Sequence, residues 1–131
     1  MKIIAFINLP HVDELWDSTA GRRLQLMLLD YVHGIKFFNL SEKPYYKSKP
    51  DKLYVYDIIE REKPKMIIFF GSDAHKVVYG MKSQIDTKGM FFWFCQHPTR
   101  PDGDFRKLKE EGLRIIAEIS ILTIEEHNTI I

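Results

Sequence analysis

The sequence lacks several features that mark whole classes of protein. Cys95 is the only cysteine, which excludes an internal disulfide and a thiolate-built zinc or iron–sulfur site. A reducing compartment is therefore expected, the cytoplasm or the nucleoid. The longest apolar runs, residues 66–70 and 90–95, fall far short of the roughly 18 residues that cross a bilayer. The first ten residues carry no small-residue cleavage site and predict a strand instead of a signal peptide.

An excess of charge of one sign and glycine-rich loops are missing as well. The formal net charge of +1 excludes a polybasic tail but allows a local basic surface. The chain has no dinucleotide fingerprint, no Walker loop and no metal-ligand spacing of His and Glu, so we expect neither cofactor nor metal. With 131 residues, 45% of them apolar and 13% aromatic, the chain suffices for a single domain over residues 1–131.

What is present is an alternation of strands and helices. Four short runs, apolar on both faces, predict buried parallel strands at residues 3–7, 35–38, 66–70 and 90–95. Helical spacing follows each run, with Gly34 closing the first helix, Pro50 opening the second, and Ser72 and Asp104 as caps of the third and fourth. Right-handed crossovers then predict a three-layer α/β/α sandwich with a four-stranded parallel sheet in the order 2-1-3-4. Residues 121–131 are left open, as an edge strand, a frayed end or an arm that docks a protein partner.

Polar residues follow each predicted strand. In such sheets ligands bind at the carboxyl ends of the strands. The residues at these ends include Asn8, Asn39, the Gly71–Ser72 pair and His97. Taken singly, each has an ordinary structural explanation as a turn residue or a helix cap. Their convergence at one edge of the sheet indicates a binding site.

A basic and aromatic segment follows the second predicted strand. Residues 43–52 hold four lysines and two tyrosines with one acid, a composition that suits a phosphate backbone and stacked bases. Arg100 would add to the same rim. A solvated loop is the alternative. Cys95 lies within an apolar strand, where a thiol is usually inert packing.

Five short motifs, in order, resemble those of the uracil-DNA glycosylase superfamily, in its short bacterial and archaeal branches. The resemblance runs from about residue 3 to about residue 118 and rests on INLPH at 7–11, Trp16 followed by Ala-Gly at 20–21, Asn39, the segment 63–75 and QHPT at 96–99. The first motif lacks the family's leading Gly and its acid, whose place Asn8 takes. The cluster cysteines of the iron–sulfur branch are absent as well.

The resemblance implies a monofunctional hydrolase that binds a flipped-out uracil or modified pyrimidine of single- or double-stranded DNA and hydrolyses its N-glycosidic bond. It assigns catalysis to Asn8, which would hold the attacking water, and His97, which would stabilise the departing base. Asp13 is a further candidate base. Base binding is assigned to Pro10, Trp16 and Asn39. Contacts to DNA are assigned to Lys43, Lys47, Lys49, Gly71, Ser72, Thr99 and Arg100.

Two other interpretations stay open. The missing acid allows a catalytically silent glycosylase-fold module that binds DNA or a protein partner. A flavodoxin-like or nucleotide-binding domain whose strand ends match by chance is the third. Release of free base separates the first interpretation from both alternatives.

Overall fold

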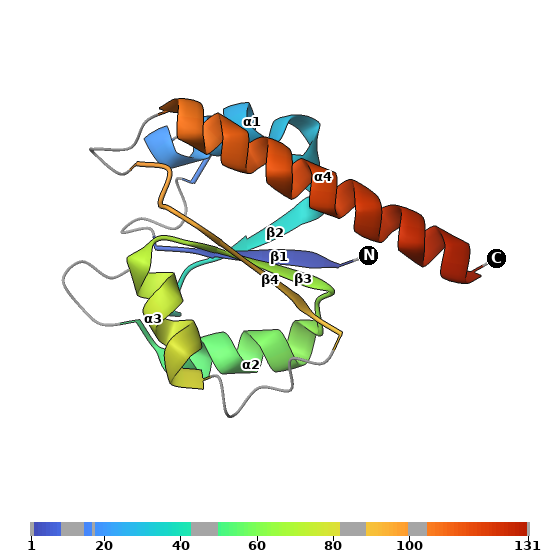
Figure 1. Ribbon diagram of the computed structural model, residues 1–131. Helices are drawn as coiled ribbons and strands as arrows, with labels where there is room; N and C mark the ends of the chain where they lie inside the picture. Colours follow the sequence, from blue (N-terminus) through green and yellow to red (C-terminus); the bar gives the residue numbers. More distant parts are fainter. Residues whose placement is uncertain are drawn as a thin grey trace.

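Four parallel strands form a sheet between two layers of helices in the computed structural model (Figure 1). The structure describes residues 2–8, 15–16, 18–42, 50–81, 89–99 and 105–130. The strands are β1 (Ile3–Ile7), β2 (Ile35–Phe38), β3 (Met66–Phe70) and β4 (Phe91–Cys95), in the order β2-β1-β3-β4. The helices are α1 (Thr19–Leu28), the 3-10 helix η2 (Leu29–Gly34), α2 (Lys52–Glu62), α3 (Ser72–Met81) and α4 (Phe105–Ile130). The predicted fold class and strand order are confirmed.

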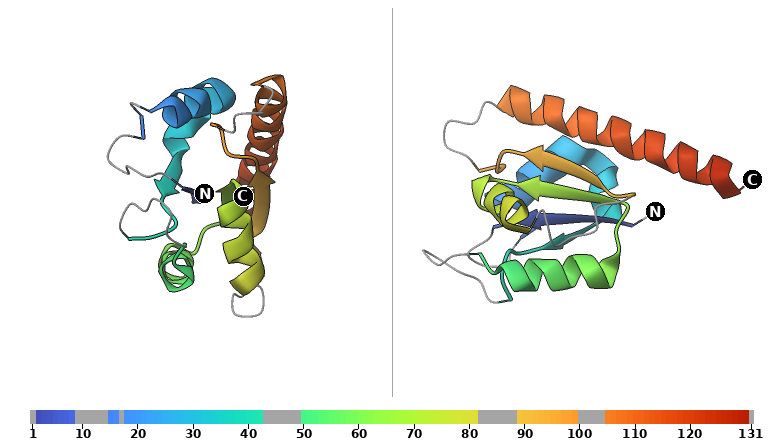
Figure 2. Two further views of the ribbon diagram at one scale, coloured as in Figure 1. Left: turned by 90° about the vertical axis from the view of Figure 1, so that its left-hand side faces the viewer. Right: turned by 60° about the horizontal axis from the view of Figure 1, so that its bottom comes forward.

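The two faces of the sheet carry separate halves of the core. In β1, Ile3, Ala5 and Ile7 pack with α1 and α4, whereas Ile4 and Phe6 pack with α2 and α3. Figure 2 shows these helix pairs on opposite sides of the sheet. Because both faces are covered, every residue of β1 and β3 is buried. Continuous apolar runs are the sequence pattern that such strands require.

Two glycines allow close backbone contacts around α1. A Cβ at Gly112 of α4 would overlap the backbone oxygen of Met27 in α1. A Cβ at Gly21 of α1 would lie too close to the backbone oxygen of Leu15 for any side chain to fit. Gly112 therefore lets α4 approach the backbone of α1, and Gly21 lets α1 lie against the residues that precede it.

The helix ends agree in part with the predicted signals. Ser18 caps α1 by accepting a hydrogen bond from the Gly21 N–H at 3.1 Å. Asp51, directly after Pro50, caps α2 through the Tyr54 N–H at 3.2 Å. Ser72 is the first residue of α3 instead of the residue before it. The predicted cap Asp104 lies outside the described residues.

The C-terminal segment belongs to the last helix. Residues 121–130, which the sequence leaves open between a strand and an arm, continue α4 as one helix to Ile130. Ile115, Ile119 and Leu122 of this helix are buried at helical spacing, which explains why the helix continues. Among the described residues, no helix is long and apolar enough to cross a membrane.

The last strand is less buried than its sequence predicts. β4 lies at the edge of the sheet, and the side chains of Phe91 and Phe94 are 47% and 43% exposed. The prediction of a strand buried on both faces is therefore wrong for β4. It is wrong for β2 as well, where Lys36 is exposed and Phe37 and Phe38 are half-buried. Both strands lie at an edge of the sheet and have a neighbouring strand on one side only.

Candidate functional site

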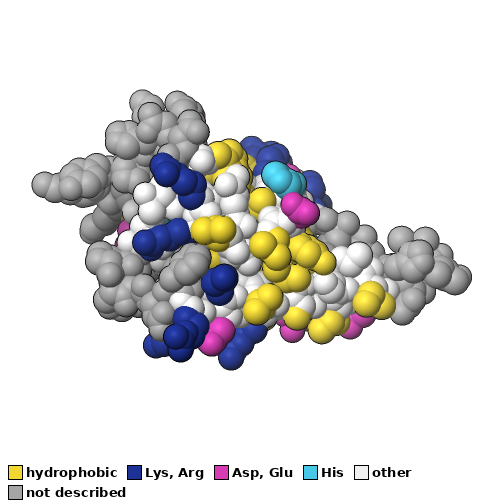
Figure 3. Space-filling view, turned by 90° about the horizontal axis from the view of Figure 1, so that it is seen from above, with side chains coloured by type: hydrophobic (Ala, Val, Ile, Leu, Met, Phe, Trp, Pro, Cys, Tyr) yellow, Lys and Arg dark blue, Asp and Glu magenta, His cyan; other side chains and the backbone are white. Residues whose placement is uncertain are grey.

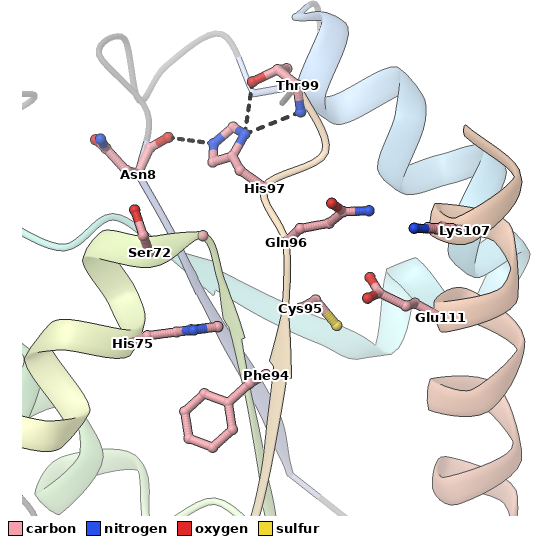
Figure 4. Close-up of a pocket in the computed structure, with 11 residues that line it drawn as sticks. Asn8, Ser72, His75, Phe94, Cys95, Gln96, His97, Thr99, Lys107 and Glu111 are labelled. Atoms are coloured by element: carbon pink, nitrogen blue, oxygen red, sulfur yellow. Dashed lines mark hydrogen bonds between the residues drawn. The ribbon is translucent and has the colours of Figure 1, made fainter. Parts of the chain in front are cut away.

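A cavity of about 970 Å³ opens at the carboxyl ends of β1, β3 and β4 (Figure 4). Asn8 follows β1, Gly71 and Ser72 follow β3, and His97 follows β4. The cavity continues around the end of β4 to the first turns of α4, where Lys107 and Glu111 line it. It therefore lies where ligands bind in open α/β sheets.

His97 is fixed by hydrogen bonds at both ring nitrogens. Its Nε2 lies 2.9 Å from the backbone oxygen of Asn8, which can only accept, so Nε2 carries the proton. Its Nδ1 accepts from the Thr99 N–H at 3.1 Å and from the Thr99 hydroxyl at 2.7 Å. The ring is thus held as the neutral Nε2–H tautomer and joins the end of β4 to the end of β1.

Burial keeps this imidazole neutral. Burial lowers the pKa of His97 below its ordinary value, while the Asn8 carbonyl and the charge of Asp73 act in the opposite direction. Protonation would also place a hydrogen on Nδ1, against the two Thr99 donors. At neutral pH the ring is therefore an uncharged N–H donor at Nε2.

Gly71 makes room for the imidazole at the end of β3. Its φ of +95° is in the region that favours glycine, and a Cβ there would lie 3.3 Å from the Cβ of His97. The ring therefore crosses directly over β3 to reach Asn8. The Gly71 N–H donates to the Cys95 oxygen at 2.8 Å, which ties the end of β3 to the end of β4.

The side-chain amide of Asn8 is hydrogen-bonded to a carboxylate. Its Nδ2 donates to Oδ2 of Asp73, in the first turn of α3, at 3.3 Å. Its Oδ1 is buried and has no hydrogen-bond partner among the described residues. The orientation of the amide is fixed, because only the NH₂ group can face the carboxylate.

The part of the cavity beside α4 contains a carboxyl group and a thiol whose pKa values are raised by burial. Burial raises the pKa of Glu111. The charge of Arg114 and a hydrogen bond with the backbone of Gln96 offset part of this rise. One Glu111 oxygen, Oε2, is buried without a hydrogen-bond partner in the described part of the chain. Burial, and then the charge of Glu111, raises the pKa of Cys95, so its thiol stays protonated. This agrees with the prediction that Cys95 is packing and no nucleophile.

The part of the cavity beside α3 is lined by aromatic rings. His75 and Phe94 meet edge to face with ring centroids 5.0 Å apart. Phe94 in turn stacks on Phe69 with centroids 5.4 Å apart. Nε2 of His75 is buried without a described partner. This part of the cavity therefore offers aromatic rings and polar atoms to a flat ligand.

The structure brings together some of the predicted site residues and separates others. Asn8, Gly71, Ser72, His97 and Thr99 all line the cavity.

Two predicted base-binding residues lie elsewhere. Trp16 lines a separate hollow of about 460 Å³ and meets Phe37 edge to face, with centroids 5.4 Å apart. Asn39 is buried, and its Oδ1 accepts from the Leu40 N–H at 2.8 Å. The amide oxygen of Asn39 therefore supports the turn after β2.

The predicted rim residues Lys43, Lys47, Lys49 and Arg100 lie outside the described residues, as do Pro10 and Asp13. Among the described basic residues, Lys107 lines the cavity, and others lie at the same end of the molecule. α1 and α4 begin at the end of the molecule where the strands end, and their first turns carry Arg22, Arg23, Arg106, Lys107 and Lys109. Figure 3 shows several Lys and Arg side chains toward this end of the face, apolar side chains beyond them, and further Lys or Arg side chains beside a histidine at the edge of the face. Arg23 also donates to the Pro98 oxygen at 2.6 Å and so supports the loop that carries His97.

Sequence reasoning gave no role to Asp73, which adjoins the cavity, and it missed Phe94, Lys107 and Glu111, which line the cavity. Asp73 had a usable signal, because it follows the third strand by three residues. Lys107 and Glu111 had none, since only the docking of α4 on the sheet brings them to β4. Within the described residues, no group of three or more His, Cys, Asp or Glu side chains is arranged to hold a metal.

Comparison of the chain with models of protein families, with curated proteins and with solved structures gave no match. The functional interpretation therefore rests on the geometry of the cavity and on the chemistry of the residues around it.

Proposed function

We propose that the chain is a DNA glycosylase-like protein, which takes an extruded uracil or modified pyrimidine into the cavity and hydrolyses its N-glycosidic bond. The observation that supports this most is the state of His97. Its neutral ring is fixed at the cavity with the proton on Nε2.

Breaking the glycosidic bond leaves negative charge on the departing base. A preorganised N–H donor stabilises such charge, and one donor of this kind contributes about 10²–10³ in rate. The Nε2–H of His97 now donates to the Asn8 oxygen, and an oxygen of the base would share or take over this hydrogen bond. A neutral imidazole can donate this hydrogen bond through its Nε2–H without carrying a positive charge.

The cavity suits a base carried by a sugar and phosphate. Its volume of about 970 Å³ lies at the upper end of small-molecule sites, which span roughly 300–1,000 Å³. The partly exposed ring of Phe94 offers a stacking face. Ser72 begins α3, so its hydroxyl and the first N–H groups of the helix are available to a phosphate.

DNA is the proposed partner because an extruded base belongs to a strand, and the protein must bind that strand to hold the base in the cavity. The predicted rim of Lys43, Lys47, Lys49 and Arg100 would supply the phosphate contacts, and Lys107 adds a cation at the cavity itself. Extruding a base costs a few kcal/mol, which stacking and hydrogen bonds in the cavity would offset. The action would take place in the cytoplasm or nucleoid.

A catalytically silent base-binding module is the second candidate. Two observations favour it. The side chain of Asn8 is an amide, which cannot take a proton from water. Both ring nitrogens of His97 are already hydrogen-bonded within the protein. Such a module would bind the extruded base and leave the bond intact.

Release of free base from uracil-containing single- and double-stranded oligonucleotides tests the proposal. His97→Gln should slow release by about 10²–10³, whereas His33→Gln, at an exposed histidine away from the cavity, should leave it unchanged. Fluorescence anisotropy of the same oligonucleotides distinguishes the candidates. Binding without release supports the silent module, and absence of both contradicts each of them.

A further inference from the structure

A carboxylate lies directly beside the residue that is proposed to hold the attacking water. Oδ2 of Asp73 accepts from Nδ2 of Asn8 at 3.3 Å, and the charge of Asp73 acts on the His97 ring. Asp73 is partly buried in the first turn of α3. It is adjacent to two residues that line the cavity, Asn8 through the hydrogen bond and Ser72 through the chain.

Hydrolysis needs a proton acceptor that Asn8 cannot provide. A water molecule that attacks the sugar must lose a proton as the new bond forms, and an amide oxygen accepts a hydrogen bond without taking the proton. A carboxylate takes it readily. Nδ2 of the Asn8 amide contacts Asp73, and Oδ1 of the same amide is a buried acceptor without a partner among the described residues. A water that bridges this Oδ1 and Asp73 would give one O–H to each side chain, which leaves its lone pairs for the sugar.

We propose that Asp73 is the general base of the glycosidic hydrolysis, with Asn8 as its partner in holding the water; this rests on the proposed function. The water oxygen forms a bond to C1′ of the sugar while the C1′–N bond breaks. The bonding pair leaves with the base, where the Nε2–H of His97 stabilises the negative charge. Asp73 takes the proton of the water and passes it to the departed base, so that free base and a sugar with a C1′ hydroxyl result.

The other carboxylate near the cavity is less suited to this role. Glu111 projects from α4 on the opposite side of β4 from Asn8 (Figure 4). Asp73 touches Asn8, whereas Glu111 takes a hydrogen bond from the backbone of Gln96. Water held by Asn8 is therefore next to Asp73.

An acid in the first turn of a helix also stabilises the helix, so the test must separate the two roles. Asp73→Asn keeps an oxygen that can accept from the Asn8 amide but removes the proton acceptor. Single-turnover release of uracil should fall by about 10²–10⁴, while oligonucleotide affinity and the thermal midpoint stay close to wild type. Asp57→Asn, at an exposed acid of α2, is the matched control and should release base at the wild-type rate.

Chemical rescue provides a readout that a structural role would not move. In Asp73→Ala, added formate should restore part of the release rate, because it supplies a carboxylate where the side chain is missing. The same formate should not accelerate His97→Gln. If wild type releases base and Asp73→Asn matches it, the role of Asp73 is wrong and the proposed function stands. If wild type releases none, the proposed function fails and this role fails with it.

Discussion

Replacing Gly71 by alanine should weaken the link between the ends of β1 and β4 without touching either strand. The perturbation is small in volume and acts in two ways. The φ of Gly71 is +95°, which L side chains rarely adopt. The new Cβ would also lie 3.3 Å from the Cβ of His97, so His97 must move by a few tenths of an ångström, whereas the 3.5 Å to its Cδ2 is an ordinary contact.

The magnitude follows from these two effects. A side chain at such a φ costs about 1–2 kcal/mol. Weakening the 2.9 Å hydrogen bond from His97 Nε2 to the Asn8 oxygen adds about 0.5–1.5 kcal/mol. The alanine also lowers the conformational entropy of the unfolded chain, which stabilises the folded state by about 0.4–1 kcal/mol. We therefore expect Gly71→Ala to lower the free energy of unfolding by about 1–3 kcal/mol.

Urea unfolding near neutral pH measures this cost. Gly34→Ala is the matched control, because a Cβ there meets nothing within 4 Å, and its midpoint should change little. The ¹⁵N shifts of the His97 ring provide a second measurement, since loss of the link should perturb the Nε2–H tautomer. A double-mutant cycle with His97→Ala should show that Gly71→Ala costs less once the ring is absent.

The reasoning is refuted if Gly71→Ala and Gly34→Ala have the same unfolding midpoint. An unchanged cost in the His97→Ala background would show that backbone strain alone is responsible, and that Gly71 is not needed to admit the ring. Activity gives an independent check. If the position of His97 matters for base release, Gly71→Ala should release base more slowly even where it remains folded.

Three further outcomes follow from other parts of the molecule. The Lys36 and Lys2 hydrogen bonds lower the pKa of Glu62 from 4.5 to about 2, so their stabilisation is complete above pH 4.5 and is lost as the pH falls toward 2. Lys36→Met should make the loss of stability between about pH 5 and about pH 3 shallower in urea titrations, and an unchanged slope would contradict this. Gly112→Ala should cost roughly 1–3 kcal/mol in the same urea assay because α4 must move away from α1; a neutral result would show that the helices adjust freely. Alanine at Lys47 and Lys49 should weaken DNA binding equally for all sequences. It should also flatten the slope of log affinity against log salt by about 0.9 for each duplex phosphate that is no longer neutralised. A DNA affinity that does not depend on salt would exclude the basic rim.

The fold could be predicted from the sequence because its signals are local. A strand covered on both faces must be apolar throughout, as β1 and β3 are, and the runs at β1, β2 and β3 give the observed bounds. Helices between them force parallel crossovers, so the layers and the sheet follow. The exposure of Phe91 and Phe94 was missed, because an apolar run has the same composition at the edge of a sheet as at its centre.

The residues at the strand ends were also predictable, since parallel strands end on one side of the sheet. Asn8, Gly71, Ser72 and His97 do meet at one cavity. Sequence order alone gives no side-chain direction beyond the last residue of a strand. The assignment of Asn39 and Trp16 to base binding therefore did not foresee that the Asn39 amide turns to its own backbone and that Trp16 packs on Phe37, away from the cavity lining.

What the sequence determined by itself is thus the layered sheet and the edge at which chemistry gathers, because both depend on periodicity and connectivity. The tertiary structure decided which atoms meet there. His97 reaches Asn8 only because β3 lies between their strands and is followed by a glycine with positive φ. Asp73 reaches Asn8 only because α3 starts beside the end of β1. These contacts join residues 65 and 89 positions apart, and such separations become short distances only when the sheet has formed.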